Sequence, residues 1–130
     1  PSEIRATLDT VRKMYTSSRL IVVFQPHLFS RTRDFAEDFG AALAEADSVW
    51  VTDIFPARET PIPGVTGGTV AEAVQRADGG HVSYVPAIGD LPNLLAEELR
   101  AGDVLLTLGA GSIDSLGGQV LDRLGERVHA

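Results

Sequence analysis

Cysteine is absent from this chain of 130 residues, which excludes disulfides, cysteine-based zinc sites and a thiol nucleophile. Long hydrophobic runs are absent too, since none approaches the ~20 residues of a membrane-spanning helix, and no signal peptide opens the chain. Positive charge is scarce: 11 Lys and Arg residues stand against 18 Asp and Glu, a formal net charge of −7. This balance argues against a surface that binds nucleic-acid phosphates. We therefore predict no membrane and no nucleic-acid partner.

Several patterns that carry catalysis are missing as well. The sequence has no G-x-x-x-x-G-K-S/T phosphate loop, no G-x-S-x-G nucleophile elbow and no pair of histidines at metal-ligand spacing. We therefore predict neither a catalytic residue nor a metal site within this chain. What is present is an ordinary globular composition, with 44% hydrophobic and 22% charged residues, and a length that predicts one domain over residues 1–130.

Hydrophobic spacing alternates between two periods along the chain. Short apolar runs, typical of strands buried on both faces, predict strands at residues 20–24, 49–52, 82–85 and 104–108. Apolar stripes at helical spacing predict helices through residues 3–16, 35–46, 69–77, 92–99 and 113–124. This alternation predicts an α/β fold, a doubly wound and mostly parallel sheet of about four strands with helices on both faces.

Ligands of such a sheet bind at the carboxyl ends of its strands. The search for a site is thereby confined to four loops, at residues 25–30, 53–59, 86–90 and 109–112. The irregular stretch at residues 54–68 is long for a connection in a compact domain, and long loops are often functional.

The first loop carries the clearest candidate site. Arg31 and Arg33 fall in the first turn of the following helix, where cations oppose the helix dipole. Beside the free N–H groups of a helix start, these cations favour binding of a carboxylate or phosphate, with His27 as a further donor. The alternative is that both arginines pair with acids of the same helix and that His27 only ends the strand.

Acids and glycines supply the remaining candidates. Asp53 and Glu59 follow the second predicted strand and can bind a metal, a hydroxyl or an arginine, or can be solvated or locally paired acids. The fourth loop reads Gly109, Ala110, Gly111 and Ser112. Its glycines allow close backbone approach, and its N–H groups are expected to line the crevice; a plain strand-to-helix turn is the alternative.

Three motifs occur in order along the chain. The first motif is V-V-F-Q-P-H at residues 22–27, followed by S-R-T-R at 30–33 and then Phe39. The second is T-D-I-F-P-A-R-E at 52–59, followed by P-I-P-G-V at 61–65. The third is L-T-L-G-A-G-S-I at 106–113. Together they resemble the C-terminal domain of the Mur ligases, in particular of the members that act on L-alanine. The resemblance covers nearly the whole chain and implies a Rossmann-like domain.

This resemblance also implies a function. The complete enzymes are cytoplasmic three-domain ligases of peptidoglycan synthesis, which join L-alanine to UDP-N-acetylmuramate with ATP and magnesium. An acyl phosphate forms on the nucleotide sugar and is attacked by the amino group. The N-terminal domain holds the sugar nucleotide, the central domain carries the phosphate loop and most magnesium ligands, and the C-terminal domain closes over the site. Its partners are thus L-alanine, ATP, UDP-N-acetylmuramate and the two other domains.

The family's site residues can be carried over by motif. His27 and Arg31 match the histidine and arginine that lie near the incoming amino acid, within a turn that also contains Ser30. Some members have a second arginine where this chain has Leu28, so either recognition by a single arginine or help from Arg33 is expected here. The turn from Gly109 to Ser112 is expected to line the same crevice.

The chain's first residues match only the end of another family motif. Pro1, Ser2 and Glu3 correspond to the last part of D-D-Y-x-H-H-P-(S/T)-E. We therefore expect a piece that lacks the first strands of its domain and is inactive alone. Two alternatives stay open: a stand-alone doubly wound module that binds a nucleotide or carboxylate, and a Mur ligase for a different amino acid.

Overall fold

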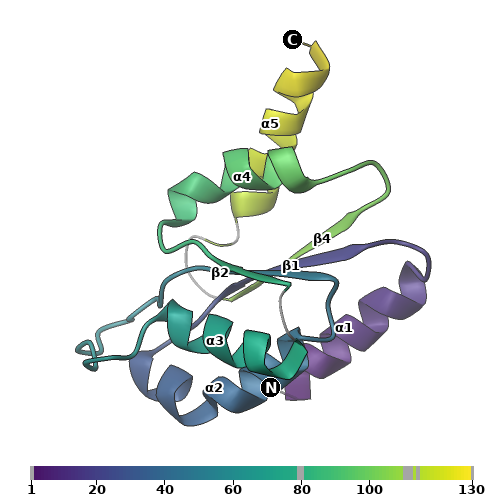
Figure 1. The fold of residues 1–130 in the computed structure, drawn as a ribbon. Helices are drawn as coiled ribbons and strands as arrows, with labels where there is room; N and C mark the ends of the chain where they lie inside the picture. The colour runs from purple at the N-terminus through teal and green to yellow at the C-terminus, as the bar shows by residue number, and fades with distance from the viewer. Residues whose placement is uncertain (1, 79–80, 110–112, 114, 130) are drawn as a thin grey trace.

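The computed structural model describes residues 2–78, 81–109, 113 and 115–129. Within this part of the chain, four parallel strands form one sheet in the order β3-β2-β1-β4 (Figure 1). The strands are β1 (Leu20–Gln25), β2 (Ser48–Val51), β3 (Val82–Tyr84) and β4 (Val104–Gly109). Each lies within one residue of its predicted bounds, and the predicted α/β fold is confirmed.

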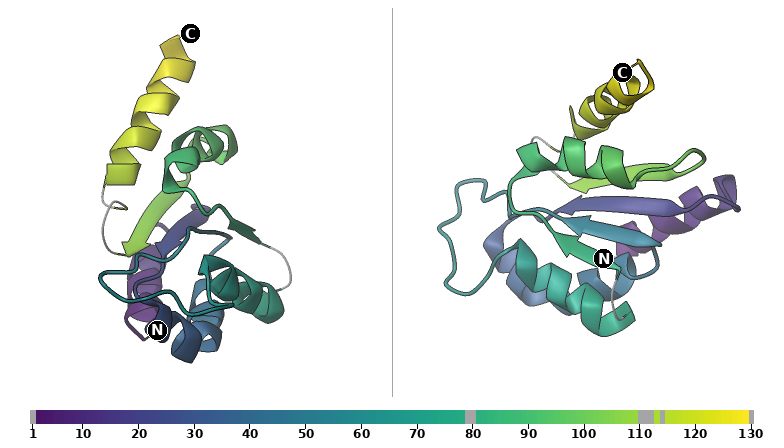
Figure 2. Two further views of the ribbon diagram at one scale, coloured as in Figure 1. Left: turned by 90° about the vertical axis from the view of Figure 1, so that its left-hand side faces the viewer. Right: turned by 45° about the horizontal axis from the view of Figure 1, so that its top comes forward.

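Helices cover both faces of the sheet. One face carries α1 (Ser2–Met14), α2 (Phe29–Leu43) and α3 (Gly67–Asp78), and the other carries α4 (Leu91–Glu98) and α5 (Leu116–His129). A short 3-10 helix, η1 (Ile88–Asp90), leads into α4. Figure 2 shows the layers edge-on, with α5 extending beyond the sheet toward the C-terminus. None of the described helices is long and apolar enough to cross a membrane.

Burial of β1 explains its unbroken apolar run. All six of its residues are buried, because β2 and β4 flank it and helices cover both its faces. Alternate side chains enter different cores: Leu20, Val22 and Phe24 face α1 to α3, whereas Ile21 and Val23 face α4 and α5. The central strand thereby joins the two halves of the hydrophobic core.

The strand order determines where a ligand can bind. The chain moves outward from β1 through β2 to β3, then returns to the other side of β1 to form β4. Ligand crevices of doubly wound sheets lie at the carboxyl ends of the strands where the order reverses. Here this position lies between Gln25 and Gly109, which pair across β1 and β4.

Close packing of α2 against α3 depends on one glycine. A methyl group built on Gly40 would lie only 2.5 Å from the Cβ atom of Ala73. Such an overlap cannot be relieved by rotating a flexible side chain, because the neighbouring atoms belong to the backbone and Cβ of α3.

Gly40→Ala should therefore destabilise the fold by about 1–3 kcal/mol, the range typical of overpacking. Gly118→Ala is the matched control in α5, since nothing lies within 4 Å of its Cβ position. We expect the control to be neutral or stabilising by up to about 1 kcal/mol. Urea unfolding measures both changes, and equal stability of the two variants would contradict this packing.

An ion-pair cluster ties the amino ends of β1 and β4 together. Arg19 Nη2 donates to Asp103 Oδ2 at 2.6 Å and also to the backbone carbonyl of Glu98 at 3.0 Å. The hydrogen bond from Arg19 holds the pKa of Asp103 below its ordinary value. Since the pKa of this carboxyl is lower in the folded chain than in the unfolded one, the pair stabilises the fold above about pH 4. That contribution is lost as the pH falls through the lowered pKa.

Arg19→Met should reduce stability by about 1–2 kcal/mol at neutral pH and by much less at about pH 2. The control is Arg5→Met, because the Arg5–Glu45 pair is 3.9 Å long and exposed. Free energies of unfolding measured in urea across this pH range test the difference. A loss for Arg19→Met that does not change with pH would show that Asp103 is not the group responsible.

Candidate functional site

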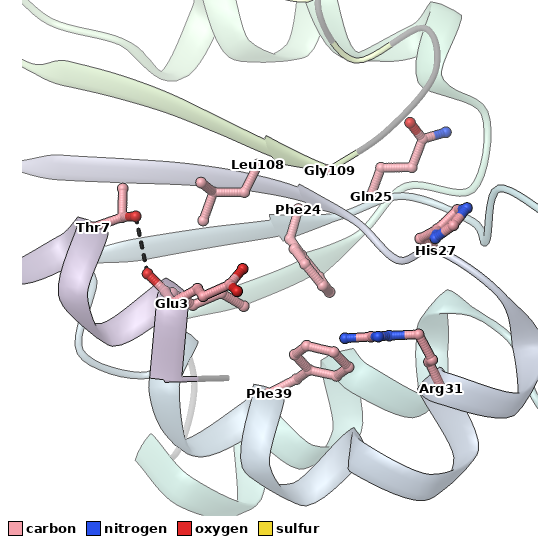
Figure 3. Close-up of a pocket in the computed structure, with 10 residues that line it drawn as sticks. Glu3, Thr7, Phe24, Gln25, His27, Arg31, Phe39, Leu108 and Gly109 are labelled. Carbon is pink, nitrogen blue, oxygen red and sulfur yellow. Dashed lines mark hydrogen bonds between the residues drawn. The ribbon is translucent and has the colours of Figure 1, made fainter.

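A pocket of about 320 Å³ opens where the strand order reverses (Figure 3). Its walls are largely apolar and come from α1, β1, α2 and β4, through Ile4, Phe24, Phe39 and Leu108. Of the residues that the structure describes, three with ionisable side chains also line it: Glu3 of α1, His27 after β1 and Arg31 of α2. The structure thus brings together two of the predicted residues, His27 and Arg31, with one that the sequence analysis missed, Glu3.

The Arg31 side chain lines this pocket and forms an ion pair with no carboxylate of the described residues. Its guanidinium carbon lies 6.0 Å from the centre of the Phe35 ring, and its side chain extends past Phe39 (Figure 3). Among the described residues, Arg31 takes part in none of the ion pairs. A guanidinium with this freedom can bind a ligand carboxylate through two parallel hydrogen bonds.

Arg33 is placed differently. Its Nε atom donates to Asp34 at 2.9 Å, and its side chain is not among those lining the pocket. The two arginines of the motif therefore separate: Arg33 follows the alternative of pairing with an acid of its own helix, whereas Arg31 faces the pocket. Of the two alternatives, recognition by a single arginine fits this geometry, and help from Arg33 does not.

The start of α2 is occupied by a carboxylate from elsewhere in the chain. Glu59 accepts hydrogen bonds from the Ser30 backbone N–H at 2.9 Å and from the Ser30 hydroxyl at 2.5 Å. The hydroxyl, aided by the backbone N–H groups of Ser30 and Phe29, lowers the pKa of Glu59. This corrects the expectation that the first N–H groups of the helix are free for a ligand. A bound anion must be held by the Arg31 side chain rather than by the helix start.

The loop carrying Glu59 runs alongside the first motif. Backbone hydrogen bonds join Phe55 to both Pro26 and Leu28, at 2.8 and 3.0 Å. The rings of His27 and Phe55 stack, with centroids 6.1 Å apart and planes inclined by 22°. His27 is exposed at the rim of the pocket, and this stacking gives its ring a defined position there.

Asp53 occupies the start of α3 in a similar way. Its Oδ1 atom accepts from the Gly67 backbone N–H and from the Tyr84 hydroxyl, each at 3.1 Å. Gly67 is the first residue of α3, and a Cβ atom there would lie 1.9 Å from the Thr52 carbonyl oxygen. Asp53 and Glu59 each accept hydrogen bonds from residues distant in the sequence, and neither acid lines the pocket that contains Arg31.

Gly109 makes the close approach predicted for the fourth loop. Its φ is 139°, and a Cβ atom there would meet the Gln25 carbonyl oxygen at 2.5 Å. The remaining predicted residues of that loop, Ala110, Gly111 and Ser112, lie outside the described residues. Gln25 is only 7% exposed, and its side-chain oxygen has no hydrogen-bond partner within the described part of the chain.

The described residues offer little that fits a nucleoside triphosphate or the metal ion bound to it. No three His, Asp or Glu side chains in the described part of the chain are grouped to hold a metal ion. The N-termini of α2 and α3, which phosphates would otherwise favour, are filled by Glu59 and Asp53. These residues therefore do not fit ATP or magnesium.

Comparison with known proteins decides the family. A sequence model described as Mur ligase, glutamate ligase domain, matches residues 1–111. The chain belongs to this family. The resemblance expected from the three ordered motifs is thereby confirmed.

Curated relatives of this Mur ligase domain are much longer than the chain. It is 58% identical over 118 residues to a UDP-N-acetylmuramate–L-alanine ligase of Cutibacterium acnes, covering 90% of this chain and 25% of the relative. It is 48% identical over 133 residues to the ligase of the same name from Chlorobium phaeovibrioides, covering 98% and 28%. The chain thus spans about a quarter of the length of these relatives.

Solved structures agree on the fold. The UDP-N-acetylmuramate-alanine ligase of Thermotoga maritima superposes with a TM-score of 0.72 at 24% identity, covering 98% of this chain and 25% of that one. A murein peptide ligase from Psychrobacter arcticus gives 0.73 at 18% identity, covering 96% and 25%. Identities this low establish the shared fold and nothing finer.

Proposed function

We propose that residues 1–130 form the C-terminal, amino-acid-binding domain of a longer ATP-dependent ligase. This ligase would join L-alanine to UDP-N-acetylmuramate in the cytoplasm, as a step of peptidoglycan synthesis. Support comes from curated relatives of that name that are 58% and 48% identical to this chain. The chain covers about a quarter of their length, so the remaining functions are assigned to domains outside it.

The observation that carries this proposal is that the Arg31 guanidinium lines a small, mostly apolar pocket and has no ion-pair partner among the described residues. L-Alanine brings a carboxylate, an amino group and one methyl group. Arg31 would hold the carboxylate, with His27 as a donor at the rim, and the apolar walls suit the methyl group. Glu3 lies across the pocket from Arg31 (Figure 3), where an acid suits the ammonium form of the amino acid.

The chemistry of this domain is recognition and orientation. When its carboxylate is held on Arg31, the amino acid has lost most of its rotational freedom, and its amino group, once it has lost its extra proton, can be directed at an acyl group presented by the other domains. Such positioning can account for several kcal/mol of a barrier. ATP and Mg²⁺ would supply the phosphoryl group and the charge neutralisation that activate the carboxylate of the nucleotide sugar, and both are assigned mainly to domains outside this chain.

We expect the isolated chain to release no phosphate with ATP, UDP-N-acetylmuramate and L-alanine. The complete protein should release it, and should prefer L-alanine when each L-amino acid is tested in turn. A preference for another amino acid would establish a different Mur ligase. Turnover by the isolated chain would contradict the assignment of the remaining functions to other domains. A complete protein that binds a nucleotide or carboxylate without turnover would be a binding module.

Arg31→Ala in the complete protein should raise the KM for L-alanine by at least about tenfold, because a charge-assisted hydrogen-bonding partner of the carboxylate is lost. The KM for ATP should change much less. The matched control is Arg76→Ala, which removes an exposed arginine that pairs with Glu37 on the helical face. Steady-state kinetics with each substrate varied separately test the assignment, and a change confined to ATP would refute it.

A further inference from the structure

The N-terminus of α2 lacks the features that usually stabilise a helix start. Its N-cap residue is Leu28, which has a φ of 68° and makes no side-chain capping hydrogen bond. Its first turn contains no acidic residue, although it carries Arg31. A cation there opposes the helix dipole, so the helix start that presents Arg31 to the pocket is destabilised by its own sequence.

Glu59 compensates for this from 29 residues away. Both carboxylate oxygens bind Ser30, one through the backbone N–H and one through the hydroxyl. The turn that delivers Glu59 contains two non-glycine residues with positive φ, Ala57 at 52° and Arg58 at 92°. Such backbone conformations cost energy and persist when the surrounding contacts require them, and here the contact that they permit is the one with Ser30.

The same arrangement leaves Arg31 available. Ser30 engages both oxygens of Glu59, so this acid stabilises the helix start without neutralising the guanidinium of the next residue. Among the described residues, Arg31 has no ion pair to fix its direction. Its position depends on the backbone from which it projects and on its contact with the Phe35 ring.

We propose that Glu59 is a positioning residue for amino-acid recognition, which fixes the first turn of α2 and thereby the point from which Arg31 reaches the pocket. This inference rests on the proposed function. Glu59 does not line the pocket, and its effect passes through Ser30 and the α2 backbone to Arg31.

Glu59→Gln in the complete protein tests this role, because it keeps the size of the side chain but leaves only one oxygen to accept from Ser30. The KM for L-alanine should rise about tenfold, well short of what complete misplacement can cost. The KM values for ATP and UDP-N-acetylmuramate should stay unchanged. The control is Glu37→Gln, an exposed acid of α2 that pairs with Arg76 of α3, and it should leave all three values unchanged.

A double variant separates positioning from general stability. In an Arg31→Ala background, Glu59→Gln should raise the KM for L-alanine no further, because substitutions at residues that act through one another do not have additive effects. Independent effects of the two substitutions, or a lower unfolding temperature with an unchanged KM, would overturn the inference. If Glu59→Gln does not fold, Ser30→Ala removes one of the two hydrogen bonds and must show the same selective change in KM.

The outcomes also separate this inference from the proposed function. A complete wild-type protein with no L-alanine-dependent turnover would overturn the proposed function and this inference with it. Turnover that responds to Arg31→Ala but not to Glu59→Gln would overturn this inference alone.

Discussion

The parallel pairing of β1 with β4 is the constraint on which the rest of the structure depends. It brings the last strand back beside the first, so that β1 has neighbours on both edges and its six residues are buried. It also puts the carboxyl ends of both strands at the reversal of the strand order, where helices leave on opposite faces. The close contact of Gly109 with the Gln25 backbone follows from the same pairing, and the pocket with Arg31 opens beside it.

Carboxylates of the chain itself determine what kind of anion site this crevice can be. Glu59 and Asp53 occupy the starts of α2 and α3, although these helix ends would otherwise attract phosphate. Among the described residues, the group that remains open to an anion in this crevice is the Arg31 guanidinium, in a mostly apolar pocket, rather than backbone N–H groups, which suit phosphates of many shapes. That arrangement favours a small carboxylate ligand over a polyphosphate.

Local sequence patterns predicted the elements of this fold but not the long-range contacts of its site. The burial of β1 shows in its unbroken apolar run, and the alternation of periods indicates a parallel α/β sheet. The different contacts of the Arg31 and Arg33 side chains could not be predicted, because both positions fit the same local pattern. The bond between Glu59 and Ser30 joins residues 29 apart through a turn with two positive-φ residues, for which neither Ala57 nor Arg58 is a recognisable signal. The contribution of Glu3 to the pocket depends on the packing of α1 beside β1 and β4, which spacing within α1 does not reveal.

The charge of the chain bears on the proposed division of labour. A net charge of −7 repels polyanions such as ATP and a nucleotide sugar at long range, whereas an amino acid is neutral overall and feels little of that field. Its recognition must therefore be local, from a cation and an acid on opposite sides of an apolar pocket. Arg31 and Glu3 have this arrangement. Under the proposed function, an acidic domain whose pocket arginine has no ion-pair partner among the described residues is suited to select the amino acid, while cationic groups in the other domains of the proposed ligase hold the phosphates.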